Sequence, residues 1–171
     1  MTKSRYLDTS REILAVSAEM CLNQEEKPMT PQALKTNQAI DIALKTIESA
    51  RKNDFKPMAV CVLDAAGTIK AQITEDGASL LRPDIAYAKA WSCLGMGHST
   101  RGQAAFAGKM PSLYQAFSGI SNDRLVPAPG GVFIVHDGVQ IGSVGVSGDM
   151  PDADETCAVA GIEAAGLAAD I

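Results

Sequence analysis

The chain has few aromatic side chains and no long apolar run. Phe, Trp and Tyr make up 5% of its 171 residues. A core with so few rings has to be built from small and β-branched residues, with backbones in close contact. No stretch approaches the ~18 consecutive apolar residues of a transmembrane helix, and the N-terminus lacks the apolar core of a signal peptide. We therefore expect a cytoplasmic protein. The length of 171 residues predicts one main domain.

Basic residues are outnumbered, with 15 Lys and Arg against 20 Asp and Glu, for a net charge of −5. A chain that binds nucleic acid or an anionic membrane surface normally carries a basic excess. The balance therefore argues against both kinds of partner.

Cysteines are few and none forms a CxxC pair. The four are Cys21, Cys61, Cys93 and Cys157. The missing ligand spacing disfavours zinc. Because each cysteine falls on an apolar face of a predicted helix or strand, we expect buried, reduced thiols.

The C-terminal third carries the clearest pattern. Two apolar runs, Val132–Val135 and Val139–Val146, flank Asp137-Gly138, a dipeptide that favours the positive φ angles of a tight hairpin. The spacing Asp152…Glu155 then fits a capping box that opens a helix of small residues. Asp154, at the start of that helix, is expected to be an N-cap rather than a catalyst.

Upstream, residues 1–29 are predicted to form a helical arm and linker, and residues 30–171 the main domain. The arm either packs on the main domain or reaches a neighbouring subunit, and we favour the second because a short helix alone is marginal in water. Thr30-Pro31 predicts a capped helix start, and the helix runs to about Lys52. Four residues form its expected buried stripe: Leu34, Ile40, Leu44 and Ile47. Met58–Leu63 and Thr68–Thr74 are predicted to pair as a second hairpin.

A helix over about 83–96 is apolar around most of its circumference, which indicates a buried helix. Lys89 stands in its middle and needs either a carboxylate partner or a polar cavity. The run Gly95–Thr100 ends the helix, and two short helices follow near 101–108 and 111–119. Helices and tight hairpins in this order predict an α+β fold: an antiparallel sheet with helices on both faces.

Several different short motifs follow one another along the chain in an order that is characteristic of one family. The C-terminal ones are Gly130-Gly131, Asp137-Gly138, Ile141-Gly142, Gly145–Gly148, Asp154-Glu155 and Ala160-Gly161. The upstream ones are Val62–Gly67, Asp76–Ala78 and Asp84–Thr100. Together they resemble the GlcG/HbpS-like, or haem-degrading domain, family, whose domain also forms the C-terminal part of PduO-type proteins. The resemblance covers about residues 30–168.

This resemblance implies a profilin-like fold, assembly from dimers into octamers, and binding of haem, which some members degrade. Other members are encoded in operons for small-organic-acid or cobalamin-linked metabolism and have no settled activity. The chain departs from the family pattern at Ser99, where proline is common, at Thr74-Glu75, and at Trp91, where small residues are frequent. These departures bear on the ligand and leave the expected fold unchanged.

The first functional hypothesis is a binding protein for haem or a related tetrapyrrole. His98, in the break after the long helix, is the candidate iron ligand and acid–base group. Haem propionates need cations, which Arg82, Lys89 and Arg101 offer. The other expected ligand contacts are Thr100, Gly130, Gly131, Ser147 and Trp91.

The alternative is a cofactor-free enzyme acting on a small carboxylated or aromatic-catabolite substrate. Arg82 would then bind the carboxylate, while Lys89, Asp84 or His98 moves a proton. Backbone amides of the double glycine or of Gly145–Gly148 would hold an oxyanion. A scaffold or sensor oligomer without chemistry is a third class. Apart from haem, no cofactor is expected.

Overall fold

The computed structural model describes residues 33–171, which form one five-stranded sheet with helices on both faces. The elements are α2 (Thr36–Lys52), β1 (Ala59–Asp64), β2 (Ile69–Thr74), α3 (Arg82–Met96), α4 (Thr100–Lys109), α5 (Pro111–Ile120), β3 (Gly131–His136), β4 (Val139–Ser147), α6 (Pro151–Ala164) and β5 (Ala168–Asp170). Every neighbouring pair in the order β2-β1-β4-β3-β5 is antiparallel. The α+β prediction is confirmed.

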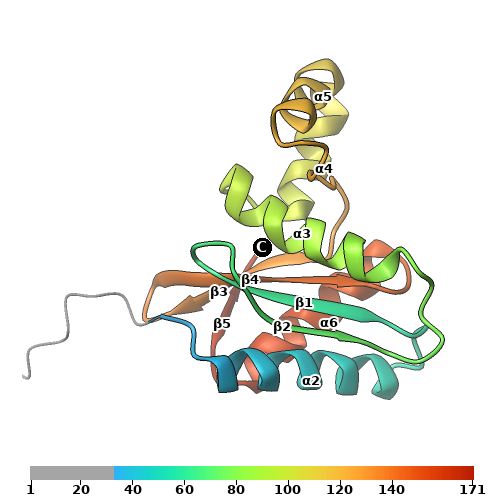
Figure 1. Ribbon diagram of the computed structural model, residues 1–171, viewed down its shortest axis with the longest axis vertical. Helices are drawn as coiled ribbons and strands as arrows, with labels where there is room; N and C mark the ends of the chain where they lie inside the picture. Colours follow the sequence, from blue (N-terminus) through green and yellow to red (C-terminus); the bar gives the residue numbers. More distant parts are fainter. Residues whose placement is uncertain (1–32) are drawn as a thin grey trace, which may run out of the picture. The chain divides into compact units, whose positions relative to one another are not determined.

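The two faces of the sheet are covered by different helices. In Figure 1, α2 and α6 lie on one face and α3 on the other, with α4 and α5 further from the sheet beyond α3. Strand β1 shows why both faces are apolar. Val60 and Val62 join the core under α2 and α6, whereas Cys61 and Leu63 join the core under α3, because successive side chains of a strand point to opposite faces.

Glycine sets how closely α3 lies on the sheet. A Cβ on Gly145 in β4 would collide with the carbonyl oxygen of Ala86 in α3. Nearby, the Ser143 hydroxyl donates to the carbonyl oxygen of Ala90 over 2.8 Å. Strand and helix are therefore in backbone contact, which is the role that small residues were expected to play.

The predicted stripe of α2 is wrong at two positions. Ile40 and Leu44 are 42% and 53% exposed, while the buried residues of the helix are Ala39, Ile42, Ala43, Thr46 and Ala50. The cause is α6. Its Gly161 lies so near α2 that a Cβ there would overlap the Thr46 hydroxyl. Small residues thus face the neighbouring helix, and the larger ones turn outward.

The long helix α3 is also not buried all round. Ala86, Lys89, Ala90, Ser92 and Cys93 are buried, but its outward face keeps half-exposed residues such as Trp91 and Leu94. Many of the apolar residues of α3 are alanines, which have little apolar surface to bury. The apolar sequence of the helix therefore led us to expect more burial than the structure has.

The C-terminal hairpin is confirmed. Asp137 and Gly138 have φ angles of 50° and 78° and connect β3 to β4. Strand β5 was not predicted. Its three residues pair with Phe133–Val135 at the edge of the sheet and follow α6 after a short connection.

Three of the cysteines, Cys61, Cys93 and Cys157, are free and buried, as expected. Cys21 and the predicted arm lie outside the described residues. The helix start predicted at Thr30-Pro31 is wrong, because residues 33–35 are not helical and α2 begins at Thr36 with Lys35 as its N-cap. Within residues 33–171, no helix has the length and apolar character needed to cross a membrane.

Candidate functional site

The break between α3 and α4 is a rigid corner that carries His98. Gly97 ends α3 in the left-handed conformation, with φ of 68°, and Ser99 caps α4 by accepting a 3.3 Å hydrogen bond from the Gly102 amide. The buried amide of Gln103 donates to the His98 carbonyl oxygen over 2.8 Å. The corner is thus fixed by its own hydrogen bonds, and the imidazole of His98 is exposed.

A cavity of about 310 Å³ opens at this corner, and we call it the His98 hollow. It lies where the α3–α4 break meets β3, β4 and the end of the chain. Its lining residues are Gly97, His98, Ser99, Arg101, Gly102, Phe133, Gln140, Asp170 and Ile171. Two of the predicted site residues, His98 and Arg101, therefore share one wall.

Arg101 connects this hollow to α6. Its Nε donates to Glu155 Oε1 over 2.7 Å and its Nη2 to Asp152 Oδ1 over 2.6 Å. The guanidinium side chain stays 48% exposed, while that of Glu155 is 7% exposed. Hydrogen bonds to both carboxylates raise the pKa of Arg101. The predicted capping box is therefore wrong, because Asp152 and Glu155 bind Arg101 and the N-cap of α6 is Met150.

Thr100 lies behind the corner and is fully buried. Its hydroxyl accepts a 2.7 Å hydrogen bond from the Gly131 amide and lies 3.3 Å from the Gly131 carbonyl oxygen, to which it donates. This exchange fixes the start of α4 to the start of β3. A ligand contact through Thr100 would have to break these bonds.

Lys89 forms a buried ion pair with Asp154. Its Nζ lies 2.7 Å from Asp154 Oδ2 and donates to the Val146 carbonyl oxygen over 2.9 Å; the two charged side chains are 3% and 1% exposed. Asp154 Oδ1 accepts from the amides of Gly148 and Asp149, each over 3.0 Å. The N-cap prediction for Asp154 is wrong, since this residue neutralises the lysine.

Little free volume remains beside the ammonium. A Cβ on Gly130 would lie 2.7 Å from Lys89 Nζ and 2.9 Å from the Asp154 Cβ. We call Lys89, Thr100, Gly130, Gly131 and Asp154 the buried polar cluster. Burial lowers the pKa of Lys89 and raises that of Asp154, while the attraction between them opposes both shifts.

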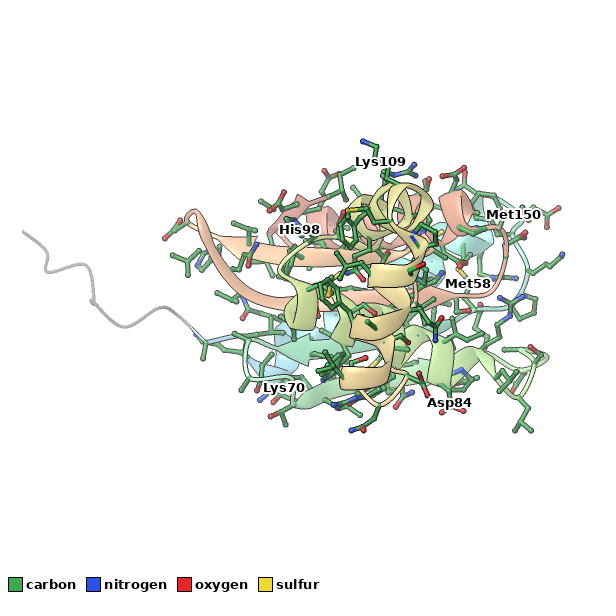
Figure 2. The ribbon with its side chains drawn as sticks, turned by 90° about the horizontal axis from the view of Figure 1, so that it is seen from above. Met58, Lys70, Asp84, His98, Lys109 and Met150 are labelled. Carbon is green, nitrogen blue, oxygen red and sulfur yellow. The ribbon has the colours of Figure 1, made fainter. Side chains whose placement is uncertain are left out.

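The remaining predicted residues lie on either side of this cluster. Arg82, at the start of α3, donates from Nη1 to the buried Ser147 hydroxyl over 3.2 Å. Asp84 is exposed, and Figure 2 shows it near the opposite end of α3 from His98. The structure therefore groups Arg82 with Ser147 and Arg101 with His98, and it leaves Asp84 outside both groups.

A second cavity of about 310 Å³, here called the Trp91 hollow, lies on the outward face of α3. Its lining residues are Trp91, Gly95, Met96, Phe117, Ile120, Ser121, Arg124 and Leu125. Arg124, whose guanidinium lies 3.9 Å from the centroid of the Trp91 ring, was not among the predicted site residues. No periodic pattern points to Arg124, because it lies in the loop after α5.

The described residues offer limited chemistry elsewhere. Burial raises the pKa of the Cys61 and Cys93 thiols to about 12, which makes them poor nucleophiles at neutral pH. No group of three or more His, Cys, Asp or Glu residues that could hold a metal ion occurs between residues 33 and 171.

The donor set of the His98 hollow fits one side of a haem group. An exposed imidazole can bind the iron, and a partly exposed guanidinium can meet a propionate. Phe133 and Ile171 are the large apolar side chains of its wall. One chain therefore supplies a ligand and a cation, while the flat macrocycle needs a second apolar surface.

Comparison with known proteins gives a consistent result. The family model described as "haem degrading protein HbpS-like" matches residues 34–163. A curated relative, the corrinoid adenosyltransferase PduO of Salmonella typhimurium, is 27% identical over 144 residues, which is 84% of this chain and 42% of that protein. The chain thus spans less than half the length of this relative.

Solved structures share the fold. The PduOC–haem complex is 25% identical with a TM-score of 0.72, covering 79% of this chain and 96% of that one. Protein ORFY of Klebsiella pneumoniae is 23% identical with a TM-score of 0.74, covering 82% and 96%. HbpS is 24% identical with a TM-score of 0.69, covering 81% and 94%.

Proposed function

The chain belongs to the HbpS-like family of haem-degrading proteins, and on that premise we propose that it binds haem or a related tetrapyrrole at the His98 hollow. The observation that carries the proposal is the exposed imidazole of His98 on a rigid corner, beside the cationic Arg101. The haem named in the PduOC complex belongs to that protein and supports the choice of ligand here.

Each residue of the hollow has a distinct part in this proposal. The neutral imidazole of His98 would bind the iron, since histidine is a common axial ligand. The exposed part of the Arg101 guanidinium would pair with a propionate, and its bonds to Asp152 and Glu155 hold it in place. Bound haem would supply the iron for any oxidative degradation, while this chain binds and orients the group.

Self-association would complete the site. A second copy packed over the hollow would supply the apolar surface that Phe133 and Ile171 alone do not provide. We therefore extend the proposal to a cytoplasmic homo-oligomer between dimer and octamer. Light scattering after size exclusion, with and without haemin, measures this directly, and a strictly monomeric haem-bound form would contradict it.

Haemin titration of the purified protein tests the ligand. We expect a saturable Soret shift with the wild type and its loss in His98→Ala. Arg101→Gln should bind more weakly but still shift the band. His136→Ala is the matched control, because His136 is the chain's other histidine and is not among the residues that line the hollow. Equal binding by His98→Ala and wild type would refute the proposed site.

The acid–base alternative has weaker structural support. It needs a proton carrier, a role that the exposed His98 can fill, and backbone N–H groups that are free to bind an oxyanion. Both charged atoms of the Lys89–Asp154 pair are bound to protein, the Gly131 amide donates to Thr100, and the Gly148 amide donates to Asp154. Small carboxylic acids can be screened for a rise in the melting temperature of the protein. A rise that is seen with the wild type and is absent in Arg82→Gln would support this alternative.

A further inference from the structure

The Trp91 hollow combines a fixed aromatic ring with an anchored cation. Trp91 lies flat along α3 over Gly95, where a Cβ would stand 2.8 Å from Cζ3 of the indole. Gly95 therefore leaves room for the ring one turn further along the helix. Since the ring is packed on the backbone of α3, its position does not depend on a ligand.

Arg124 is held in place from two sides. Its guanidinium lies 3.9 Å over the Trp91 ring, a cation–π arrangement, and its Nε donates to the Ser121 carbonyl oxygen over 2.9 Å. Its backbone is also fixed, since the Ser92 hydroxyl donates to the Arg124 carbonyl oxygen over 3.3 Å and accepts from the Val126 amide over 3.0 Å. The guanidinium is thus oriented before any ligand arrives.

The outer edge of this guanidinium remains unused. Within residues 33–171, neither terminal nitrogen of Arg124 has a carboxylate or carbonyl partner. The two terminal N–H groups of a guanidinium match the two oxygens of a carboxylate. In contrast, the terminal nitrogen of Arg101 in the other hollow already binds Asp152.

Apart from Ser121, whose hydroxyl donates to the Ser118 carbonyl oxygen, the rest of the wall is apolar. Leu125 is buried, Phe117 and Met96 are half-buried, and Ile120 at the rim is 81% exposed. The volume of about 310 Å³ lies at the lower end of the roughly 300–1,000 Å³ of small-molecule sites. These features together specify a ligand with a flat apolar body and one negative end.

We propose that the Trp91 hollow is a second ligand site, which binds a small aromatic monocarboxylate of the benzoate type. The carboxylate pairs with the terminal nitrogens of Arg124, the Trp91 ring supports the guanidinium from behind, and the ring of the ligand packs on Phe117 and Leu125. This site is independent of the haem proposal, because none of its lining residues lines the His98 hollow.

Trp91 makes the test direct, because it is the only tryptophan of the chain. We expect sodium benzoate to change the tryptophan fluorescence saturably, and benzamide, which has the same shape without the charge, to bind at least about tenfold more weakly. Arg124→Gln should lose a similar factor, while Arg124→Lys keeps part of the affinity. His98→Ala is the matched control and should bind benzoate as the wild type does.

Three results would overturn the proposal. The first is unchanged fluorescence with millimolar benzoate in the full-length protein, which is also the outcome if a second copy covers the hollow through α5. The second is equal binding of benzoate by Arg124→Gln at unchanged melting temperature. The third is competition between haemin and benzoate in the wild type, which would place both ligands in one site.

Discussion

The buried polar cluster and the His98 hollow both adjoin the α3–α4 corner but differ in whether their polar atoms are bound to protein or exposed. In the cluster, the charged and hydroxyl groups are bound to other protein atoms, as in the Lys89–Asp154 pair and the Thr100–Gly131 exchange. In the hollow, the His98 imidazole is exposed and Arg101 is half-exposed.

This difference distinguishes residues that stabilise the fold from residues that are available to bind a ligand. A charged residue in a core suggests a site, yet the partners of Lys89 account for its burial without any ligand. A ligand needs polar atoms whose hydrogen bonds are still available. By that criterion, the cluster stabilises the fold by joining α3 to α6 and α4 to β3, and the two hollows are the places where we propose that ligands bind.

The largest expected effect comes from breaking the buried pair. Lys89→Ala should lower the free energy of unfolding by about 3–5 kcal/mol, because it leaves Asp154 buried without its cation. The double variant Lys89→Met/Asp154→Asn should regain part of that loss, because no charge is left buried and the side-chain oxygen of asparagine can still accept from the Gly148 and Asp149 amides. Urea denaturation measures both. A loss below about 1 kcal/mol in Lys89→Ala would mean that the lysine does not hold the fold and that its role has to be reconsidered.

A smaller effect is expected from the Thr100 hydroxyl. Thr100→Val keeps the shape of the side chain but leaves the buried Gly131 amide unpaired, which should cost about 1–3 kcal/mol. Thr156→Val is the matched control, because its exposed hydroxyl bonds only to its own helix, and it should change stability by less than about 0.5 kcal/mol. Equal losses in the two variants would contradict the role given to Thr100.

The third prediction concerns pH. Amides of Lys56 and Met150 donate to Asp149 and lower the pKa of its carboxyl below the ordinary value. The folded state thus favours the carboxylate, and this stabilisation is present above about pH 4 and is lost as the pH falls through the lowered pKa. Asp149→Asn should be less stable than the wild type at pH 6, with the gap narrowing towards pH 3. A stability difference between the two proteins that grows on acidification would contradict the lowered pKa of Asp149 in the folded state.

The smallest effect on stability is expected in the hollow itself. His98→Ala should leave the melting temperature nearly unchanged, because the corner is held by Gly97, Ser99 and Gln103 rather than by the imidazole. Thermal unfolding without haemin measures this. A large destabilisation would show that His98, like Lys89, belongs to the packed part of the molecule, and the contrast between the two regions would then disappear.

Local signals predicted the elements of the fold well. The positive φ angles expected of Asp137-Gly138 are present, and so is the end of α3 within the Gly95–Thr100 run. The stripe of α2 was misjudged because the rule that large apolar residues face inward assumes ordinary helix spacing. Gly161 and Thr46 bring α2 and α6 closer than that, so small residues occupy the contact.

The site was less predictable, because its contacts join distant parts of the chain. His98 was singled out from its place in a glycine-rich break and Arg101 as a cation near the same helix, and both line the His98 hollow. The role of Asp154 was missed since its partner Lys89 is 65 residues away, whereas capping is a local pattern. Arg124 was missed for the same reason, because two of its contacts, with the Trp91 ring and with the Ser92 hydroxyl 32 residues earlier, come from the distant α3.

The close approach of α3 to β4 at Gly145 limits where a protein of this fold can evolve specificity for a new ligand. The spacing there is set by main-chain atoms of Ala86 and Ala90, so replacing side chains elsewhere does not open a cavity between helix and sheet. New specificity has to arise on the outer surface of α3 and in the segments after it. The interior can then stay the same while the exterior diversifies.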